Sequence, residues 1–195
     1  AGPAGVMRSV LRCAVFATAL LSYCIVAALP AHAGRLPVIA DPDSAWKKYL
    51  AEDTDVAPRY RFPHANCFRA AAAAHGLPET LLLAVARGES DFEPTARSKA
   101  NAHGVMQILW PPTARHLGIY RLSALYDPCT NIDAGARYLK EMLATFNGNL
   151  HLALAAYNYG PERIARNTSN IPSGARWYSG YIYRHLTYVL GDRKG

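Results

Sequence analysis

Residues 78–90 read Pro-Glu-Thr-Leu-Leu-Leu-Ala-Val-Ala-Arg-Gly-Glu-Ser. Proline is tolerated in the first turn of a helix, and Glu79 follows it near the positive end of the helix dipole. The i, i+3, i+4, i+7 spacing of one helix face is shared by Leu82, Val85, Ala86 and Glu89. The stretch therefore predicts a helix over 78–90 whose apolar face ends in a carboxylate.

The chain on both sides of this helix carries further helical patterns. The apolar stripe that runs from Ile132 to Phe146 is typical of an amphipathic helix. The other predicted helices cover residues 67–75, 112–118, 150–159 and 175–190, and no strand pattern of comparable length is present. We therefore expect a compact all-α domain over 66–190, with room for a small β-hairpin in the loop 91–108.

The N-terminal part has the pattern of an export signal. Residues 7–33 combine two arginines with an apolar run and a small-residue Ala-His-Ala site, which predicts a cleaved signal peptide. The alternative is an uncleaved membrane anchor, because the apolar run is near the lower limit for spanning a bilayer. Residues 34–65 are rich in proline and charge, and we expect an arm with one short helix around 43–51.

The cysteines indicate a structural bridge. Two of the four fall in the predicted signal, so Cys67 and Cys129 remain as an even pair in an exported chain. Such a pair favours a disulfide. Closing a loop of this length contributes roughly 4 kcal/mol in the chain-entropy model. Two buried free thiols are the alternative.

Glu89 is the candidate catalytic group. It continues an apolar helix face and lies in the last helical turn, where the negative end of the dipole disfavours an anion. Desolvation and dipole both raise the pKa of such a carboxyl, as a general acid requires near neutral pH. The alternative is a structural Glu89 paired with a cation such as Arg97. We interpret Asp91 and Glu93, which leave this helix face, as solvated loop charges.

Three separated motifs accompany Glu89. The first reads Glu89-Ser90-x-Phe92-x-Pro94, the second Gly104-Val105-Met106-Gln107-Ile108, and the third Ala156-Tyr157-Asn158-Tyr159-Gly160-Pro161. Together, in this order, they resemble the soluble lytic transglycosylase domain family over about residues 67–165. The resemblance implies a fold similar to goose-type lysozyme and an enzyme that cleaves the glycan strands of peptidoglycan.

The resemblance also implies a role for each matching residue. Glu89 protonates the glycosidic oxygen between N-acetylmuramic acid and N-acetylglucosamine, then takes the proton of the sugar's C6 hydroxyl, which closes a 1,6-anhydro ring. One carboxyl suffices where the neighbouring N-acetyl group stabilises the anomeric charge. The implied substrate-binding residues are Ser90, Gly104, Met106, Gln107, Tyr157 and Asn158. Among them, Tyr157 resembles the tyrosine that hydrogen-bonds the glutamate, and Asn158 a contact for acetamido groups.

The chain departs from the family pattern at two places. Asn101 stands where the family commonly has glycine, but asparagine tolerates left-handed backbone, so we expect the turn to be kept. The stretch 109–113 is one residue longer than usual, which changes the local shape of the expected groove. Trp110 within it has two interpretations, a sugar-stacking platform or a packing residue.

The charge and composition of the chain indicate which classes of binding partner to expect. The net charge of +7, or +5 without the two signal arginines, favours an anionic partner such as peptidoglycan. The sequence has no dense Lys/Arg stripe with interleaved aromatics, the pattern typical of nucleic-acid binding. The histidines form no i, i+4 pair or Cys/His cluster, so we expect no metal and no cofactor. A periplasmic location follows, with membrane contact only if the signal is uncleaved.

A narrower resemblance joins Cys67 to the segment Asp127-Pro128-Cys129-Thr130-Asn131-Ile132. This combination is similar to small specialised transglycosylases that accompany secretion, invasion or conjugation machineries. Two other functions stay open. One is a muramidase-type hydrolase, in which water replaces the C6 hydroxyl. The other is a non-catalytic wall-binding subunit of a secretion machine.

Overall fold

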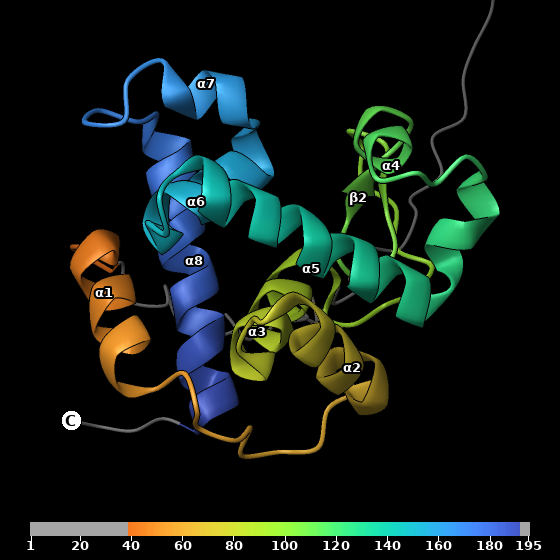
Figure 1. Ribbon diagram of the computed structural model, residues 1–195, viewed down its shortest axis with the longest axis horizontal. Coiled ribbons are helices and arrows are strands. Elements are labelled where there is room, and N and C mark those ends of the chain that lie inside the picture. Colours follow the sequence, from red (N-terminus) through yellow and green to blue (C-terminus); the bar gives the residue numbers. More distant parts are fainter. Residues whose placement is uncertain (1–38, 192–195) are drawn as a thin grey trace, which may run out of the picture. The chain divides into compact units, whose positions relative to one another are not determined.

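The computed structural model describes residues 39–191, which fold as a helical domain with one small hairpin (Figure 1). The predicted signal, residues 7–33, lies outside the described residues. The helices are α1 (Pro42–Glu52), α2 (Ala65–His75), α3 (Glu79–Ser90), α4 (Pro112–His116), α5 (Pro128–Thr145), α6 (Leu150–Tyr159), α7 (Pro161–Ala165) and α8 (Ser173–Leu190), and a 3₁₀ turn spans Leu122–Tyr126. The all-α prediction is confirmed.

The small β-hairpin expected in the loop 91–108 is present, and it lies at the C-terminal end of that loop. Strands β1 (Ala102–His103) and β2 (Ile108–Leu109) pair antiparallel, with Ala102 opposite Leu109 and His103 opposite Ile108. Asn101 takes the left-handed conformation at φ 66°, as its residue type allows. Its side-chain amide donates to the carbonyl oxygen of Trp110 at 3.0 Å, which closes the base of the hairpin.

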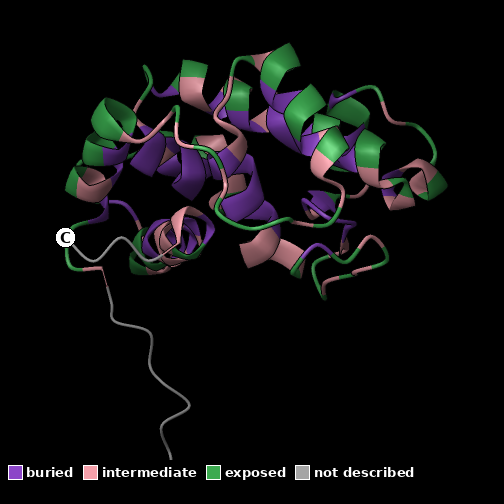
Figure 2. Cartoon of the chain, turned by 90° about the horizontal axis from the view of Figure 1, so that it is seen from below, coloured by how far each residue is buried: buried purple, intermediate pink, exposed green. Residues whose placement is uncertain are grey.

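Helix α3 is the centre of the domain. The sequence pattern predicts one apolar face, but residues 80–86 are all buried, because α2, α5 and α8 pack around the helix (Figure 1). Figure 2 shows the same distribution, with buried residues where helices meet and exposed residues on their outer faces. The predicted one-sided helix is thus a core helix, and its C-terminal turn is held from several directions.

The disulfide between Cys67 and Cys129 is present and joins α2 to the first turn of α5. Asp127 caps that turn by accepting a hydrogen bond from the Thr130 amide at 2.8 Å. The bridge and the cap together anchor the start of α5 beside α2. This placement matters for the site, because the next residue of α5, Asn131, holds the loop that follows β1.

The structure describes part of the segment expected as an arm, residues 34–65, and the short helix expected around 43–51 is α1. In its described part, α1 packs against α6 and α8, and both Trp46 and Tyr49 are 1% exposed. The Trp46 indole donates to the Ser179 hydroxyl at 3.0 Å, and the Tyr49 hydroxyl pairs with the Thr80 hydroxyl at 2.8 Å. Two large aromatic side chains give this short segment enough apolar area to join the core. None of the helices within 39–191 is long and apolar enough to cross a membrane.

Candidate active site

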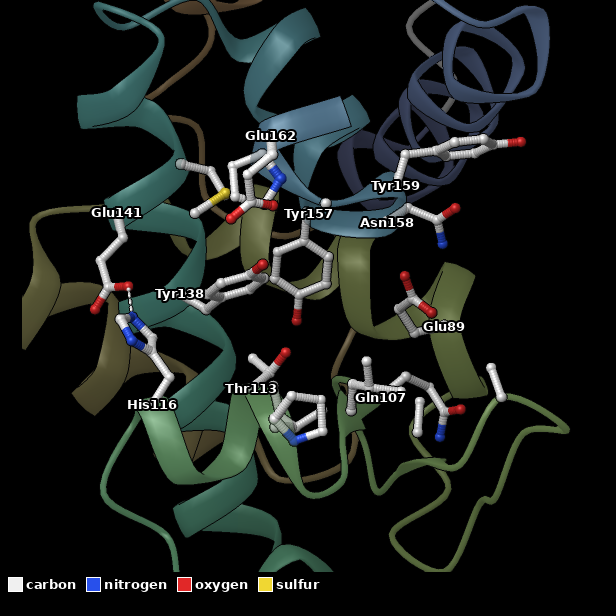
Figure 3. Close-up of a pocket in the computed structure, with 18 of the residues that line it drawn as sticks. Glu89, Gln107, Thr113, His116, Tyr138, Glu141, Tyr157, Asn158, Tyr159 and Glu162 are labelled. Atoms are coloured by element: carbon white, nitrogen blue, oxygen red, sulfur yellow. Dashed lines mark hydrogen bonds and ion pairs between the residues drawn. The ribbon is translucent and has the colours of Figure 1, made fainter. Parts of the chain in front are cut away.

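A groove of about 790 Å³ opens beside the C-terminal end of α3. Its walls come from α3, the β1–β2 hairpin, α4, α5 and the α6–α7 junction. Glu89, Gln107 and Asn158 lie at one end, His116 and Glu141 lie at the other, and Tyr138 and Tyr157 lie between them (Figure 3).

Glu89 meets the requirements of a general acid. It lies in the last turn of α3, and burial raises the pKa of its carboxyl to about 7. A hydrogen bond from the Tyr178 hydroxyl to Oε1 acts the other way, because it favours the ionised form. The desolvation effect is the larger of the two. A carboxyl with a pKa near 7 is protonated in a substantial fraction of molecules at neutral pH and can also accept a proton afterwards.

Tyr178 is a site residue that the sequence analysis missed. The resemblance implies that Tyr157 hydrogen-bonds the glutamate, but in the structure the donor to Glu89 is Tyr178 of α8. The Tyr157 hydroxyl donates instead to the Met106 carbonyl oxygen at 2.8 Å. Burial, and then the charge of Glu89, raise the pKa of both tyrosines well above 10. Both phenols therefore remain protonated donors beside the acid.

A signal for Tyr178 exists in the sequence. The buried face of α8 is formed by Ala175, Tyr178, Ile182, Leu186 and Val189, which recur at helical spacings of three and four. Tyr178 is the one member of this stripe that carries a hydroxyl. A polar group on an apolar helix face requires a buried partner.

Three of the expected substrate-binding residues do not line the groove. Met106 is fully buried, and Gly104 is buried at φ +78°. A Cβ on Gly104 would lie 2.3 Å from both the Leu125 carbonyl oxygen and the Asn131 amide nitrogen, so the glycine permits close packing rather than close approach to a sugar. The Ser90 hydroxyl donates to the Val105 carbonyl oxygen at 2.8 Å. These residues position the loop instead of facing the groove.

Asn131 completes this support. Its Oδ1 accepts from the Met106 amide at 2.7 Å, and its Nδ2 donates to the carbonyl oxygens of His103 and Leu125 at 2.9 and 3.0 Å. The side chain is fully buried. Three backbone groups, those of His103, Met106 and Leu125, thus depend on a residue two positions after Cys129, so the disulfide-bearing end of α5 supports the loop beside the site.

Gln107 and Asn158 do face the groove, as expected. The Gln107 amide donates to the Gly104 carbonyl oxygen at 2.9 Å, which fixes its position on the groove wall. Asn158 is exposed at the end of α6 and is accessible to a ligand. Both carry a donor and an acceptor, and this is the chemistry that an acetamido group requires.

The structure also describes the loop charges and Trp110 near the site. Asp91, with a side chain that is 83% exposed, and Glu93, which accepts from Thr95, are loop charges as interpreted. Trp110 packs against the main core and is not among the groove residues, which favours the packing interpretation. Within residues 39–191, no cluster of His, Cys, Asp and Glu is placed to hold a metal ion.

The residues at the end of the groove away from Glu89 were not predicted from the sequence. His116 of α4 and Glu141 of α5 pair at 2.7 Å across this end, and Glu162 lies nearby (Figure 3). Tyr138 lies between this end and Glu89, and burial raises the pKa of its hydroxyl. These residues come from three separate elements, and nothing in their local sequence indicates that they share a wall.

The fold and the site define the class: a small lysozyme-like helical domain with one partly buried, protonatable carboxyl at the end of a groove. The family model for the transglycosylase SLT domain matches residues 66–179, more than half of the chain. The chain therefore belongs to the transglycosylase SLT domain family.

Individual relatives agree with this assignment. The soluble lytic murein transglycosylase of Escherichia coli K12 is 36% identical over 113 residues, which are 53% of this chain and 17% of the relative. The membrane-bound lytic murein transglycosylase C of Haemophilus influenzae PittGG is 31% identical over 159 residues, 72% of this chain and 44% of the relative. The chain thus spans less than half the length of either protein.

Solved structures show the same fold. An inactive mutant of the lytic transglycosylase Slt from Pseudomonas aeruginosa matches with a TM-score of 0.58 and 29% identity, over 76% of this chain and 27% of that chain. The complex of a 70-kDa soluble lytic transglycosylase with bulgecin A matches with a TM-score of 0.58 and 28% identity, over 67% of this chain and 25% of that chain.

Proposed function

We propose that this chain is a lytic transglycosylase that cleaves the MurNAc-β-1,4-GlcNAc bond of peptidoglycan and leaves a 1,6-anhydroMurNAc end. The observation that carries the proposal is the state of Glu89, whose pKa burial raises to about 7 at the end of a groove in an SLT-family domain. A muramidase-type hydrolase is the main alternative, because the same acid also serves hydrolysis.

In the proposed reaction Glu89 acts twice. As an acid it gives its proton to the glycosidic oxygen, and the bond from that oxygen to the anomeric carbon breaks. As a carboxylate it then removes the proton of the C6 hydroxyl, whose oxygen bonds to the anomeric carbon. The carboxyl thus returns to its starting state, and no water is consumed. The Tyr178 hydroxyl stabilises the carboxylate between the two steps by donating to Oε1.

One carboxyl is sufficient in this scheme if the substrate's own acetamido group stabilises the anomeric charge. Of the other groove carboxylates, Glu141 lies at the end away from Glu89, and Glu162 lies between Glu141 and Glu89 in this view (Figure 3). Asn158 and Gln107, which lie on the Glu89 side, supply hydrogen bonds for acetamido groups. Tyr157 supports the Met106 backbone, while Ser90 and Gly104 hold the same loop in place.

The proposed location is outside the cytoplasm, in the periplasm. The signal pattern of residues 7–33, the Cys67–Cys129 disulfide and the net charge of +7 support export to a compartment that contains anionic peptidoglycan. We further propose that the enzyme opens the wall for a secretion or conjugation apparatus. The support for this role is the similarity of Cys67 and the segment 127–132 to specialised transglycosylases.

The decisive experiment is product analysis of digested sacculi. We expect mass spectrometry to find anhydro-muramyl ends with the parent enzyme and none with Glu89→Gln. Glu93→Gln is the matched control, because it makes the same change at an exposed loop position four residues away and should leave activity unchanged. Reducing ends in place of anhydro ends would show a hydrolase, and unchanged wall clearing by Glu89→Gln would remove Glu89 from the mechanism.

A further inference from the structure

The β1–β2 hairpin contains a buried histidine to which the proposed mechanism assigns no role. His103 is 1% exposed and follows Ala102, a residue of the groove wall, in β1. Both of its ring nitrogens have partners. Nε2 lies 2.9 Å from Oδ1 of Asn101, and Nδ1 lies 2.9 Å from the Tyr126 hydroxyl. A buried imidazole that is hydrogen-bonded on both sides connects the two segments that supply its partners.

The direction of each of these hydrogen bonds follows from the carbonyl oxygen of Trp110. A carbonyl oxygen only accepts, so the Asn101 amide turns Nδ2 toward Trp110, at 3.0 Å, and Oδ1 toward His103. Because Oδ1 also only accepts, Nε2 of His103 carries the proton. A neutral imidazole has one donor and one acceptor, so Nδ1 accepts from the Tyr126 hydroxyl. Burial, and then the charge of Arg97, lower the pKa of His103, which keeps the ring neutral at neutral pH.

These three side chains form the His103 relay, defined here as Tyr126, His103 and Asn101. The relay joins the end of the 3₁₀ turn to the base of the hairpin, where the Trp110 amide also donates to the Asn101 carbonyl oxygen at 2.9 Å. The segment 101–110 begins and ends at this base. Its members in the groove wall are Ala102, Gln107, Ile108 and Leu109. The relay therefore holds the two ends of a wall segment together from the buried side.

The relay also explains why asparagine stands at position 101, where the family commonly has glycine. Glycine readily adopts the left-handed backbone found here at φ 66°, but it has no side chain to join His103 to Trp110. Asparagine tolerates the same conformation and supplies both hydrogen bonds. We therefore expect glycine at this position to keep the turn and to weaken the base of the hairpin.

We propose that His103 is a positioning residue for the reaction, which acts through Asn101 to hold the hairpin wall where the glycan strand binds. Gln107 of this wall lies at the same end of the groove as Glu89 (Figure 3). Neither His103 nor Tyr126 is among the residues that line the groove, so their effect passes through the backbone of the hairpin. This inference rests on the proposed transglycosylase function, because it concerns how that enzyme binds its glycan.

The relay should affect substrate binding more than the chemical step. A wall that is ordered before the strand arrives reduces the entropy lost on binding. The acid itself lies on α3 and keeps its own hydrogen bond from Tyr178, which does not involve the hairpin. Loss of the relay should therefore raise KM and leave kcat nearly unchanged.

Two single variants and their combination test the relay on soluble glycan strands. Tyr126→Phe removes one hydroxyl, and Asn101→Gly removes the amide but keeps the left-handed turn. We expect each to raise KM about fivefold to tenfold, the size of one buried hydrogen bond, with kcat within about twofold of the parent. Because both changes break the same relay, the double variant should raise KM no further than the more affected single variant.

Tyr120→Phe is the matched control. It removes the same hydroxyl from a tyrosine that is 75% exposed and lies outside both the groove and the relay, so KM should stay at the parent value. Unchanged KM in both single variants would overturn the inference. A double variant whose KM rises by the product of the two single effects would overturn it as well, because the two residues would then act independently.

A second measurement needs no substrate. In NMR spectra that report the ring nitrogens of the parent, with His103 assigned by comparison with His103→Gln, Nε2 should carry the proton and Nδ1 should be bare. Tyr126→Phe should move the Nδ1 signal, and Tyr120→Phe should leave it in place. A proton on Nδ1 with a bare Nε2 would overturn the relay. A parent enzyme that forms no anhydro products would instead overturn the proposed function, whatever the state of the ring.

Discussion

Replacement of Glu89 by glutamine should stabilise the folded protein relative to the parent, and this difference in stability should grow as the pH rises. The carboxyl is held where burial disfavours its ionised form, and its pKa in the folded state is about 7 against 4.5 ordinarily. A pKa raised by folding means that the contribution to stability is full below about pH 4.5 and is lost as the pH rises to about 7. Glutamine cannot ionise, and its amide oxygen still accepts the Tyr178 hydrogen bond.

The expected size follows from the shift of the pKa. Each pKa unit corresponds to about 1.4 kcal/mol, so full ionisation of Glu89 costs the folded state roughly 3 kcal/mol. Part of this cost is present at about pH 5, where the unfolded carboxyl already ionises, and the full cost is reached at about pH 8. The gain from Glu89→Gln should therefore grow by about 2 kcal/mol between these two pH values, or by about 4–8 °C in Tm.

The assay is chemical denaturation of the parent and Glu89→Gln across this pH range. The difference between the two proteins isolates Glu89, because other groups such as His185, whose pKa burial lowers to about 4, titrate equally in both. Glu93→Gln is the control. Hydrogen bonds from Thr95 lower the pKa of Glu93, so this variant should show no gain at high pH. A parent–variant gap that stays flat with pH would refute the argument that Glu89 is desolvated.

Three further changes test the site and its support. Tyr178→Phe removes the hydrogen bond that lowers the pKa of Glu89, so the alkaline limb of kcat/KM against pH should move up by about one to two units; a limb that moves down or stays in place would contradict this. Changing Cys67 and Cys129 together to serine should lower the free energy of unfolding by roughly 4 kcal/mol in urea denaturation; a loss below about 1 kcal/mol would contradict the loop-entropy argument. Asn131→Ala should reduce kcat/KM and cost about 2–4 kcal/mol of stability, because it leaves buried backbone groups of the groove loop unpaired; full activity in the variant would show that the loop needs no such support.

Much of this protein could be predicted from local and periodic features of its sequence. The helices follow from apolar spacing, the left-handed turn before β1 from the tolerance of Asn101 for that conformation, and the disulfide from an even pair of cysteines. Glu89 stood out because it is a carboxylate on an apolar helix face, where desolvation of its charge costs free energy. Each of these signals is contained within a few helical turns, where the chain's own geometry determines which side chains share a face.

The surroundings of Glu89 depend on contacts between residues that are far apart in the sequence. Its hydrogen-bond donor, Tyr178, lies 89 residues away, and Tyr157 reaches Met106 across 51 residues. The motif residues Gly104 and Met106 turned inward because the loop packs on Asn131, and α1 joined the core through Trp46 and Tyr49. Such contacts depend on how helices pack against one another, which the periodicity of any single helix does not specify. The candidate acid could therefore be identified from the local sequence, whereas its neighbours, and through them its pKa, depend on how the helices pack.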